Sequence, residues 1–172
     1  SVRVNSEAYA RTLRRVRLGM RERDIAAELD YQMRLHGAEK PAFDTIVAAG
    51  VRSALPHAQP GGRRLEENEL LLIDMGACLD GYMSDMTRVS FLGIPTKRVR
   101  ELYGAVLEAQ MAGIDAVRPG VTAAQVDGAA REVLKRHGLD RQFVHSTGHG
   151  LGLEIHEGPR IGKKDQTKLQ AG

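Results

Sequence analysis

Two aspartates, Asp74 and Asp85, flank a sequence that predicts a tight β-hairpin. Asp80-Gly81 is a strong signal for a two-residue turn between the apolar run 70–77 and the segment 82–91. Partners across such a hairpin have numbers that sum to 161, so Asp74 faces Thr87 and lies diagonally across from Asp85 on one side. A charge within the apolar run is costly unless a cation or a proton offsets it. The pattern indicates a metal site, with two solvated surface aspartates as the alternative.

Histidines supply a second group of donors. Three of the six lie within residues 145–159, at His145, His149 and His156, among glycines that let the backbone approach a ligand closely. In such an extended segment His149 and His156 need not point the same way, so we expect one of them to be a metal ligand. One imidazole with two carboxylates suits manganese, cobalt, zinc or iron better than calcium. His36 and His137 stand at predicted helix ends, where we expect structural roles.

The elements that position these residues form a repeat. Residues 15–37 align with residues 116–138 at an offset of 101, which superposes Gly19 on Gly120 and His36-Gly37 on His137-Gly138. The matches fall on a glycine turn, the apolar stripe of a helix and the glycine that ends it. We therefore expect two related halves, each with two helices followed by strands.

Helix caps and strand signals complete this picture. Ser6 and Thr96 are expected to cap the first helix of each half, and Thr122 with Gln125 forms a capping-box pattern for the second helix of the later half. Strands are expected over 43–50, 70–77, 82–91, 143–150 and 151–158. Because helices and antiparallel strands come in blocks, an α+β fold is favoured over a nucleotide-binding α/β fold.

Composition excludes several classes of protein. The chain has 172 residues, 42% of them apolar and 27% charged, as in ordinary globular domains. No apolar stretch approaches the roughly 20 residues of a membrane span, so no membrane partner is expected. A net charge of +3, with four tyrosines, three phenylalanines and no tryptophan, disfavours nucleic acid as a partner. The lone cysteine, Cys78, rules out a disulfide scaffold and fits a cytoplasmic location.

Three motifs occur in a recognisable order: LPH (55–57), LLIDMGACLDGYMSDMTR (71–88) and HSTGHGLGLEIHEGP (145–159). Together they resemble the pita-bread metallopeptidases, most closely the Xaa-Pro dipeptidase and aminopeptidase branch. The likeness covers nearly the whole chain. It implies an α+β pita-bread fold with two pseudo-symmetric halves, in agreement with the internal repeat.

The resemblance also implies a dinuclear metal centre. Asp74, Asp85 and His149 match ligand positions of the family, which binds two divalent ions, here expected to be manganese or cobalt with zinc or iron as alternatives. His57 and His156 match residues that line the substrate cleft. By this likeness His156 stabilises the oxyanion of the tetrahedral intermediate, and His57 and His145 help to hold the substrate.

The implied activity is hydrolysis of the N-terminal Xaa-Pro bond of dipeptides or short peptides by a metal-activated water. Methionine aminopeptidases share the ligand pattern and are one alternative, although the surroundings of His57 and the extra His145 look more like the proline-directed branch. A non-catalytic peptide-binding module of the same fold is the other alternative. A homodimer is common in the family and is expected here.

One departure from the family pattern concerns its two further glutamate ligands, one of which is also the general base. The family has them downstream of the third motif, and residues 1–172 do not reach them. Glu154 and Glu157 are poor substitutes because they flank His156, where the family has residues outside the ligand set. We therefore interpret 1–172 as one catalytic domain that lacks its C-terminal part and a separate N-terminal domain, and expect this piece alone to be inactive.

Overall fold

A computed structural model describes residues 1–172, which form two compact units. The first unit comprises Ser1–Pro95 with Leu151–Ile155, and the second comprises Thr96–Gly150 with His156–Gly172. Each unit contains one half of the predicted repeat. None of the helices combines the length and the apolar character needed to cross a bilayer.

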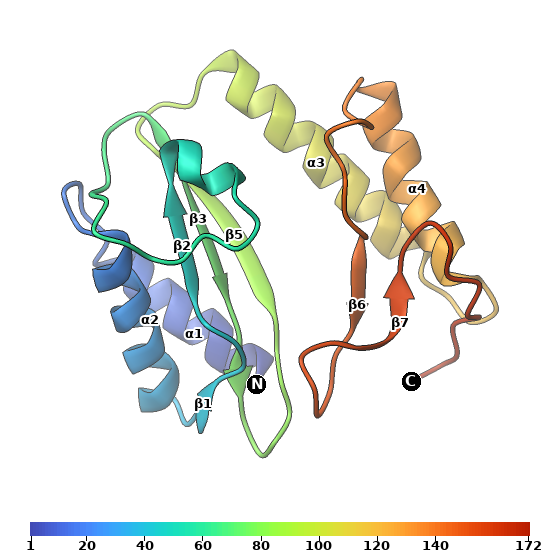
Figure 1. The fold of residues 1–172 in the computed structure, drawn as a ribbon, viewed down its shortest axis with the longest axis horizontal. Helices are drawn as coiled ribbons and strands as arrows, with labels where there is room; N and C mark the ends of the chain where they lie inside the picture. Colours follow the sequence, from blue (N-terminus) through green and yellow to red (C-terminus); the bar gives the residue numbers. More distant parts are fainter. The chain divides into compact units, whose positions relative to one another are not determined.

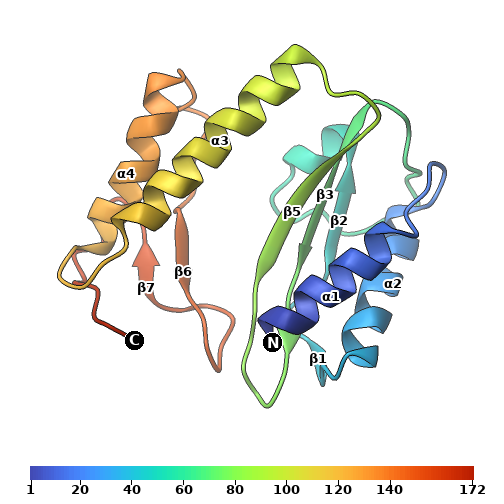
Figure 2. The same ribbon diagram turned by 180° about the vertical axis from the view of Figure 1, so that it is seen from behind.

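The first unit packs two helices on a small antiparallel sheet. Figures 1 and 2 show both helices lying across the same face of the sheet, whose strand order is β2-β3-β5. A short 3₁₀ helix follows β2, and two further strands, β1 and β4, pair with each other. The elements are α1 (Val2–Leu13), α2 (Glu22–Leu35), β1 (Lys40–Pro41), β2 (Ile46–Ala49), η1 (Gly50–Ala54), β3 (Glu69–Met75), β4 (Ala77–Cys78) and β5 (Met86–Leu92).

Alternation along β3 divides the sheet into two faces. Leu71, Ile73 and Met75 are at most 1% exposed and join α1 and α2 in the main hydrophobic core. Leu72 points the other way, into a smaller cluster with residues of β2 and the loop after η1. Asp74 shares the parity of Leu72 and is only half-buried. Asp74 therefore lies on the face of the sheet that the helices do not cover.

The second unit consists of α3 (Lys97–Ala116), α4 (Ala123–Arg136) and the antiparallel strands β6 (Gly148–Gly150) and β7 (Glu157–Ile161). Both views show α3 and α4 lying side by side (Figures 1 and 2). Small residues allow this approach, since a Cβ atom added at Gly113 would lie 3.7 Å from that of Ala130. Ala109, Val133 and Leu134 complete the buried cluster.

Two of the three predicted helix caps are confirmed. Thr96 Oγ1 accepts a hydrogen bond from Val99 N, and Thr122 and Gln125 form the reciprocal capping box at the start of α4. The prediction for Ser6 was wrong. Helix α1 already begins at Val2, and the Ser6 hydroxyl lies inside the helix, where it donates to Val2 O at 3.2 Å.

The repeat is confirmed and reaches further than the aligned sequences. Helices α2 and α4 each have 14 residues, and both ends of α4 lie 101 residues after those of α2. In both halves a later segment returns to the glycine turn: Gly19 N donates to Leu65 O, and Gly120 N donates to Leu169 O. These return segments are offset by 104 rather than 101, so a three-residue insertion hides this part of the repeat from direct sequence comparison.

The strands are shorter than predicted at four places. Residues 43–50 contribute only β2, residues 82–91 contribute β5 from Met86 onward, and residues 143–150 contribute only β6. Residues 151–155 form no strand, because they join the first unit, where Met83 N donates to Gly152 O at 2.7 Å.

Candidate functional site

Asp74 occupies the position on the hairpin that the sequence predicts. It pairs with Thr87 of β5 on one side and with Ile46 of β2 on the other. The Thr87 hydroxyl donates to Asp74 Oδ1 at 2.7 Å. Asp74 avoids most of the predicted cost of burial, because Leu71, Ile73 and Met75 face the opposite side of the sheet and Asp74 itself is only half-buried. Burial alone therefore does not require a cation beside Asp74.

The predicted hairpin register is also confirmed. The ladder runs to Met75 opposite Met86 and resumes with the bridge of Leu79 to Tyr82, each pair summing to 161. Asp80 and Gly81 form the turn with φ angles of 52° and 77°, both in the left-handed region. The register thus places the exposed Asp85 opposite Gly76, two residues before Thr87.

The backbone beside Asp85 is held rigidly. The fully buried Ser84 hydroxyl donates to Ala77 O and accepts from Ala77 N, both at 3.1 Å, and Ser84 N also donates to Ala77 O. A Cβ atom at Gly76 would overlap with the Ser84 carbonyl oxygen. Close packing of this kind fixes the direction in which the hairpin presents Asp85.

In the second unit, His149 and His156 lie against each other. Their ring centroids are 4.3 Å apart with an interplanar angle of 54°. His149 is part of β6, opposite Arg160 of β7, and its Nδ1 lies 2.9 Å from Gly150 O. Because a carbonyl oxygen only accepts, a neutral His149 that makes this contact has its proton on Nδ1 and its lone pair on Nε2. The two imidazoles, which the sequence allowed to act apart, share one location.

His145 and His57 belong to anchored loops. The exposed His145 ring stacks edge-on against Phe143, with centroids 4.8 Å apart, and its Nδ1 lies 2.8 Å from Ser146 O. His57 is exposed in the loop that follows η1. His145, which lies four residues before His149 in the same segment, thus packs its ring against Phe143.

A buried carboxylate that the sequence reading missed holds the His57 loop. Glu22, at the first position of α2, is fully buried and accepts hydrogen bonds from Ala49 N at 3.0 Å and Gly61 N at 3.2 Å. Arg52 Nε lies 3.2 Å from both carboxylate oxygens of Glu22, and Arg52 Nη2 donates to Gln59 O. Glu22 thus binds both ends of the loop that carries His57.

A second missed carboxylate holds the histidine segment of the other unit. Asp127 of α4 is fully buried and pairs with Arg131 one turn later. Burial raises the pKa of Asp127, but hydrogen bonds from Arg131 and Thr147 and the charge of Arg131 outweigh it, so that the pKa is lowered. The sequence signal was an acidic residue beside Val126 on the apolar stripe, followed by a basic residue four positions later.

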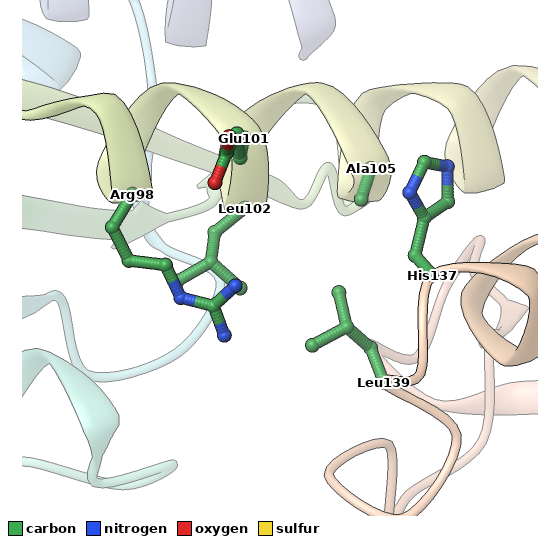
Figure 3. Close-up of a pocket in the computed structure, with 6 residues that line it drawn as sticks. All are labelled: Arg98, Glu101, Leu102, Ala105, His137 and Leu139. Carbon is green, nitrogen blue, oxygen red and sulfur yellow. The ribbon is translucent and has the colours of Figure 1, made fainter.

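The predicted histidines at helix ends are structural, as expected. His36 ends α2, with Nδ1 2.7 Å from Gln32 O, and His137 ends α4, with Nε2 2.7 Å from Glu108 Oε2. His137 also lines a hollow of about 290 Å³ in the second unit (Figure 3). That hollow contains none of the residues predicted to bind metal or substrate. It is lined by Arg98, Glu101, Leu102, Ala105, His137 and Leu139.

The three predicted metal ligands are divided between the units, with Asp74 and Asp85 in the first and His149 in the second. Neither unit alone contains a group of three or more His, Cys, Asp or Glu side chains that could hold a metal ion. The individual donors nevertheless fit such an ion. Metal-binding carboxylates are themselves hydrogen-bonded, as Asp74 is, and metal-binding imidazoles donate their other N–H to a carbonyl, as His149 does.

Comparison with known proteins decides the family. The model of metallopeptidase family M24 matches residues 1–172. The chain belongs to this family. Among curated M24-type relatives, the Xaa-Pro dipeptidase of Pyrococcus furiosus is 47% identical over 169 residues, which cover 98% of this chain and 49% of that protein. The Xaa-Pro dipeptidase of Pyrococcus horikoshii is 43% identical over the same length.

Solved structures agree with this M24 assignment. The prolidase from Pyrococcus furiosus superposes with a TM-score of 0.96 and 46% identity, over 99% of this chain and 50% of that one. The X-Pro aminopeptidase from Thermotoga maritima MSB8 gives a TM-score of 0.94 and 43% identity, over 97% and 47%. The predicted α+β pita-bread fold is confirmed. The chain spans about half the length of the relatives it matches.

Proposed function

We propose that the complete protein containing this chain is a metal-dependent exopeptidase that hydrolyses the N-terminal Xaa-Pro bond of dipeptides or short peptides. The observation that carries the proposal is the hairpin, whose register aligns Asp74 with Thr87 and places Asp85 beside them, in a chain that matches family M24 over its full length. Relatives named Xaa-Pro dipeptidase support the substrate class.

In this proposal Asp74, Asp85 and His149 hold two divalent ions, manganese or cobalt first, with zinc or iron as alternatives. When bound, such ions lower the pKa of a water molecule and polarise the scissile carbonyl. The Thr87 hydroxyl keeps the Asp74 carboxylate oriented, and the Gly150 carbonyl keeps His149 in the tautomer whose lone pair is on Nε2. Along the chain, His149 precedes by three residues Gly152, whose carbonyl oxygen accepts a hydrogen bond from Met83 N of the hairpin.

The remaining histidines handle the substrate. His156, whose ring lies tilted against that of His149, donates an N–H to the oxyanion that develops as the carbonyl is attacked. His57 and His145 orient the peptide from the loops that Glu22 and Arg131 anchor. We propose that further carboxylate ligands and the general base come from parts of the protein outside these 172 residues, and that the active form is a cytoplasmic homodimer.

The test uses the complete protein, a panel of Xaa-Pro dipeptides and a peptide that begins Met-Ala. Cobalt or manganese added to the metal-free protein should restore hydrolysis of the Xaa-Pro substrates. Asp85→Asn should lower kcat/KM by at least about 100-fold, because it removes a ligand rather than a supporting contact. Asp80→Asn is the matched control, since it makes the same charge change in the same hairpin and asparagine tolerates a left-handed φ.

Three results would contradict the proposal. Unchanged activity of Asp85→Asn would remove the hairpin from the reaction. Retained folding without binding of divalent ions would favour a non-catalytic peptide-binding module. Preferred release of methionine, with indifference to proline, would identify a methionine aminopeptidase.

A further inference from the structure

The ion pair of Asp127 and Arg131 makes contacts that an ordinary helix-surface pair does not make. The two residues lie one turn apart on α4, with side chains 0% and 16% exposed. Arg131 Nε donates to Asp127 Oδ2 at 2.6 Å, and Nη2 donates to Asp127 Oδ1 at 3.2 Å. The fork of the guanidinium is therefore fixed in one plane by its partner, which leaves its outer N–H groups pointing away from the helix.

Those outer groups bind the backbone that leads to β6. Arg131 Nη1 donates to Phe143 O at 2.8 Å, Nη2 donates to His145 O, and the guanidinium carbon lies 4.3 Å from the centre of the Phe143 ring. Asp127 Oδ1 accepts from both the hydroxyl and the amide of Thr147, at 2.8 and 3.1 Å. The pair thus holds residues 143, 145 and 147, three alternate positions of the segment that leads to β6.

Thr147 connects this anchor to the strand that contains His149. The Thr147 amide also donates to Ile161 O at 2.8 Å, one step before the ladder pair of Gly148 with Ile161. The same N–H therefore belongs to the anchor on α4 and to the β6–β7 pairing. Moving the anchor shifts the start of β6, and His149 lies only two residues further along.

The other half of the repeat shows that the fold does not need this pair. Residues 101 positions earlier are Ala26 and Asp30, so no ion pair stands at the equivalent place on α2. There the Thr45 hydroxyl donates to Asp30 Oδ1, a single side-chain contact before β2. The buried ion pair with its backbone contacts is thus specific to the half whose first strand contains His149.

We propose that Asp127 and Arg131 are positioning residues that set the place and orientation of His149, and with it His145, by holding the backbone of residues 143–147. The proposal rests on the proposed function in one respect, namely that His149 is a metal ligand. What it adds is a mechanical link from α4 to β6 that does not depend on a bound metal.

The decisive variant is Arg131→Lys in the complete protein. Lysine keeps the charge beside Asp127, but its compact ammonium has only three N–H donors and cannot reproduce the four hydrogen bonds of the planar guanidinium. Arg136→Lys is the matched control: it makes the same substitution on the same helix, where Arg136 is exposed and pairs with Glu108. Thr147→Val, which removes the hydroxyl bound by Asp127, tests the link from the strand side and serves if Arg131→Lys does not fold.

Two readouts separate positioning from general stability. Hydrogen exchange of the Thr147 and Gly148 amides should accelerate by about 10-fold or more in Arg131→Lys, while amides of α3 stay protected as in the control. Affinity for added Co²⁺ should fall by about 10- to 100-fold, with a changed visible spectrum of the bound ion. Thr147→Val should shift both readouts in the same direction.

The proposal would be overturned if the Thr147 amide exchanged at the same rate in Arg131→Lys as in the control Arg136→Lys. It would also be overturned if Arg131→Lys exchanged faster at Thr147 but bound Co²⁺ with unchanged affinity and spectrum. The proposed function fails separately. If the unsubstituted protein binds no divalent ion, the metal assignment is wrong, and exchange at Thr147 and Gly148 alone then decides whether the pair positions this segment.

Discussion

Replacement of Glu22 by alanine tests how much of the first unit depends on one buried carboxylate. Glu22 is fully buried, and it joins the end of β2, the 3₁₀ helix and the loop after His57 through its contacts with Ala49, Arg52 and Gly61. We expect Glu22→Ala to destabilise this unit strongly, because three donors lose one acceptor at the same time.

The magnitude follows from the partners. Ala49 is 0% exposed, so its unpaired N–H costs about 1–3 kcal/mol. The side chain of Arg52 is 33% exposed and regains water, so its lost pairing adds about 1 kcal/mol. The half-exposed Gly61 N–H adds less than about 1 kcal/mol. The free energy of unfolding should therefore fall by about 2–5 kcal/mol, a range that includes the cost of breaking a buried ion pair.

Urea unfolding followed by circular dichroism measures this loss, and hydrogen exchange at the Ala49 amide locates it. Glu22→Gln should lose about half as much, since an amide oxygen still accepts from one backbone N–H. Glu67→Ala, at an exposed position of the same unit, should change stability by no more than about 0.5 kcal/mol. A loss below about 1 kcal/mol in Glu22→Ala, with normal protection of Ala49, would refute the reasoning.

Two other predictions concern the second unit and acid pH. Gly150→Ala should lower the urea midpoint of unfolding and weaken divalent-ion binding, because a methyl group there would overlap with the Gly158 carbonyl. Gly148→Ala is the control, since a methyl group at Gly148 has open space and should be tolerated. Equal behaviour of the two variants would contradict this account of the packing. Acid should destabilise the protein between about pH 5 and pH 2, because the lowered pKa values of Asp127 and Glu69 mean that the folded chain binds fewer protons there than the unfolded chain. Urea unfolding at several pH values measures this slope, which should become shallower in Glu69→Gln and would be unchanged if Glu69 were not involved.

Local and periodic features could be read from the sequence. The offset of 101 gives both ends of α4 from those of α2, the capping box fixes the start of α4, and Asp80-Gly81 fixes the register that pairs Asp74 with Thr87. Each of these depends on residues that are close in sequence or related by a regular spacing. The motifs around them also identified the family correctly.

Long-range polar contacts could not be read in this way. Glu22 looks like a favourable acid in the first turn of a helix, and Asp127 looks like half of an i,i+4 pair, until the backbone groups that they bind are known. Asp74 shows the opposite error, because an apolar sequence around it suggested burial, whereas alternation places its neighbours on the other face. The contact of Gly152 with Met83 helps to explain why residues 151–155 form no strand.

The assignment of Leu151–Ile155 to the first unit affects how this protein can be dissected. The polypeptide crosses the boundary between the units three times, after Pro95, after Gly150 and after Ile155. If the chain were divided after Pro95, the first piece would lack residues Leu151–Ile155, whose Gly152 carbonyl accepts from Met83. The second piece would keep these residues without the hairpin to which they bind. The halves therefore repeat a pattern without being separable modules, because the first unit takes from the later half of the chain the segment whose Gly152 carbonyl accepts from Met83.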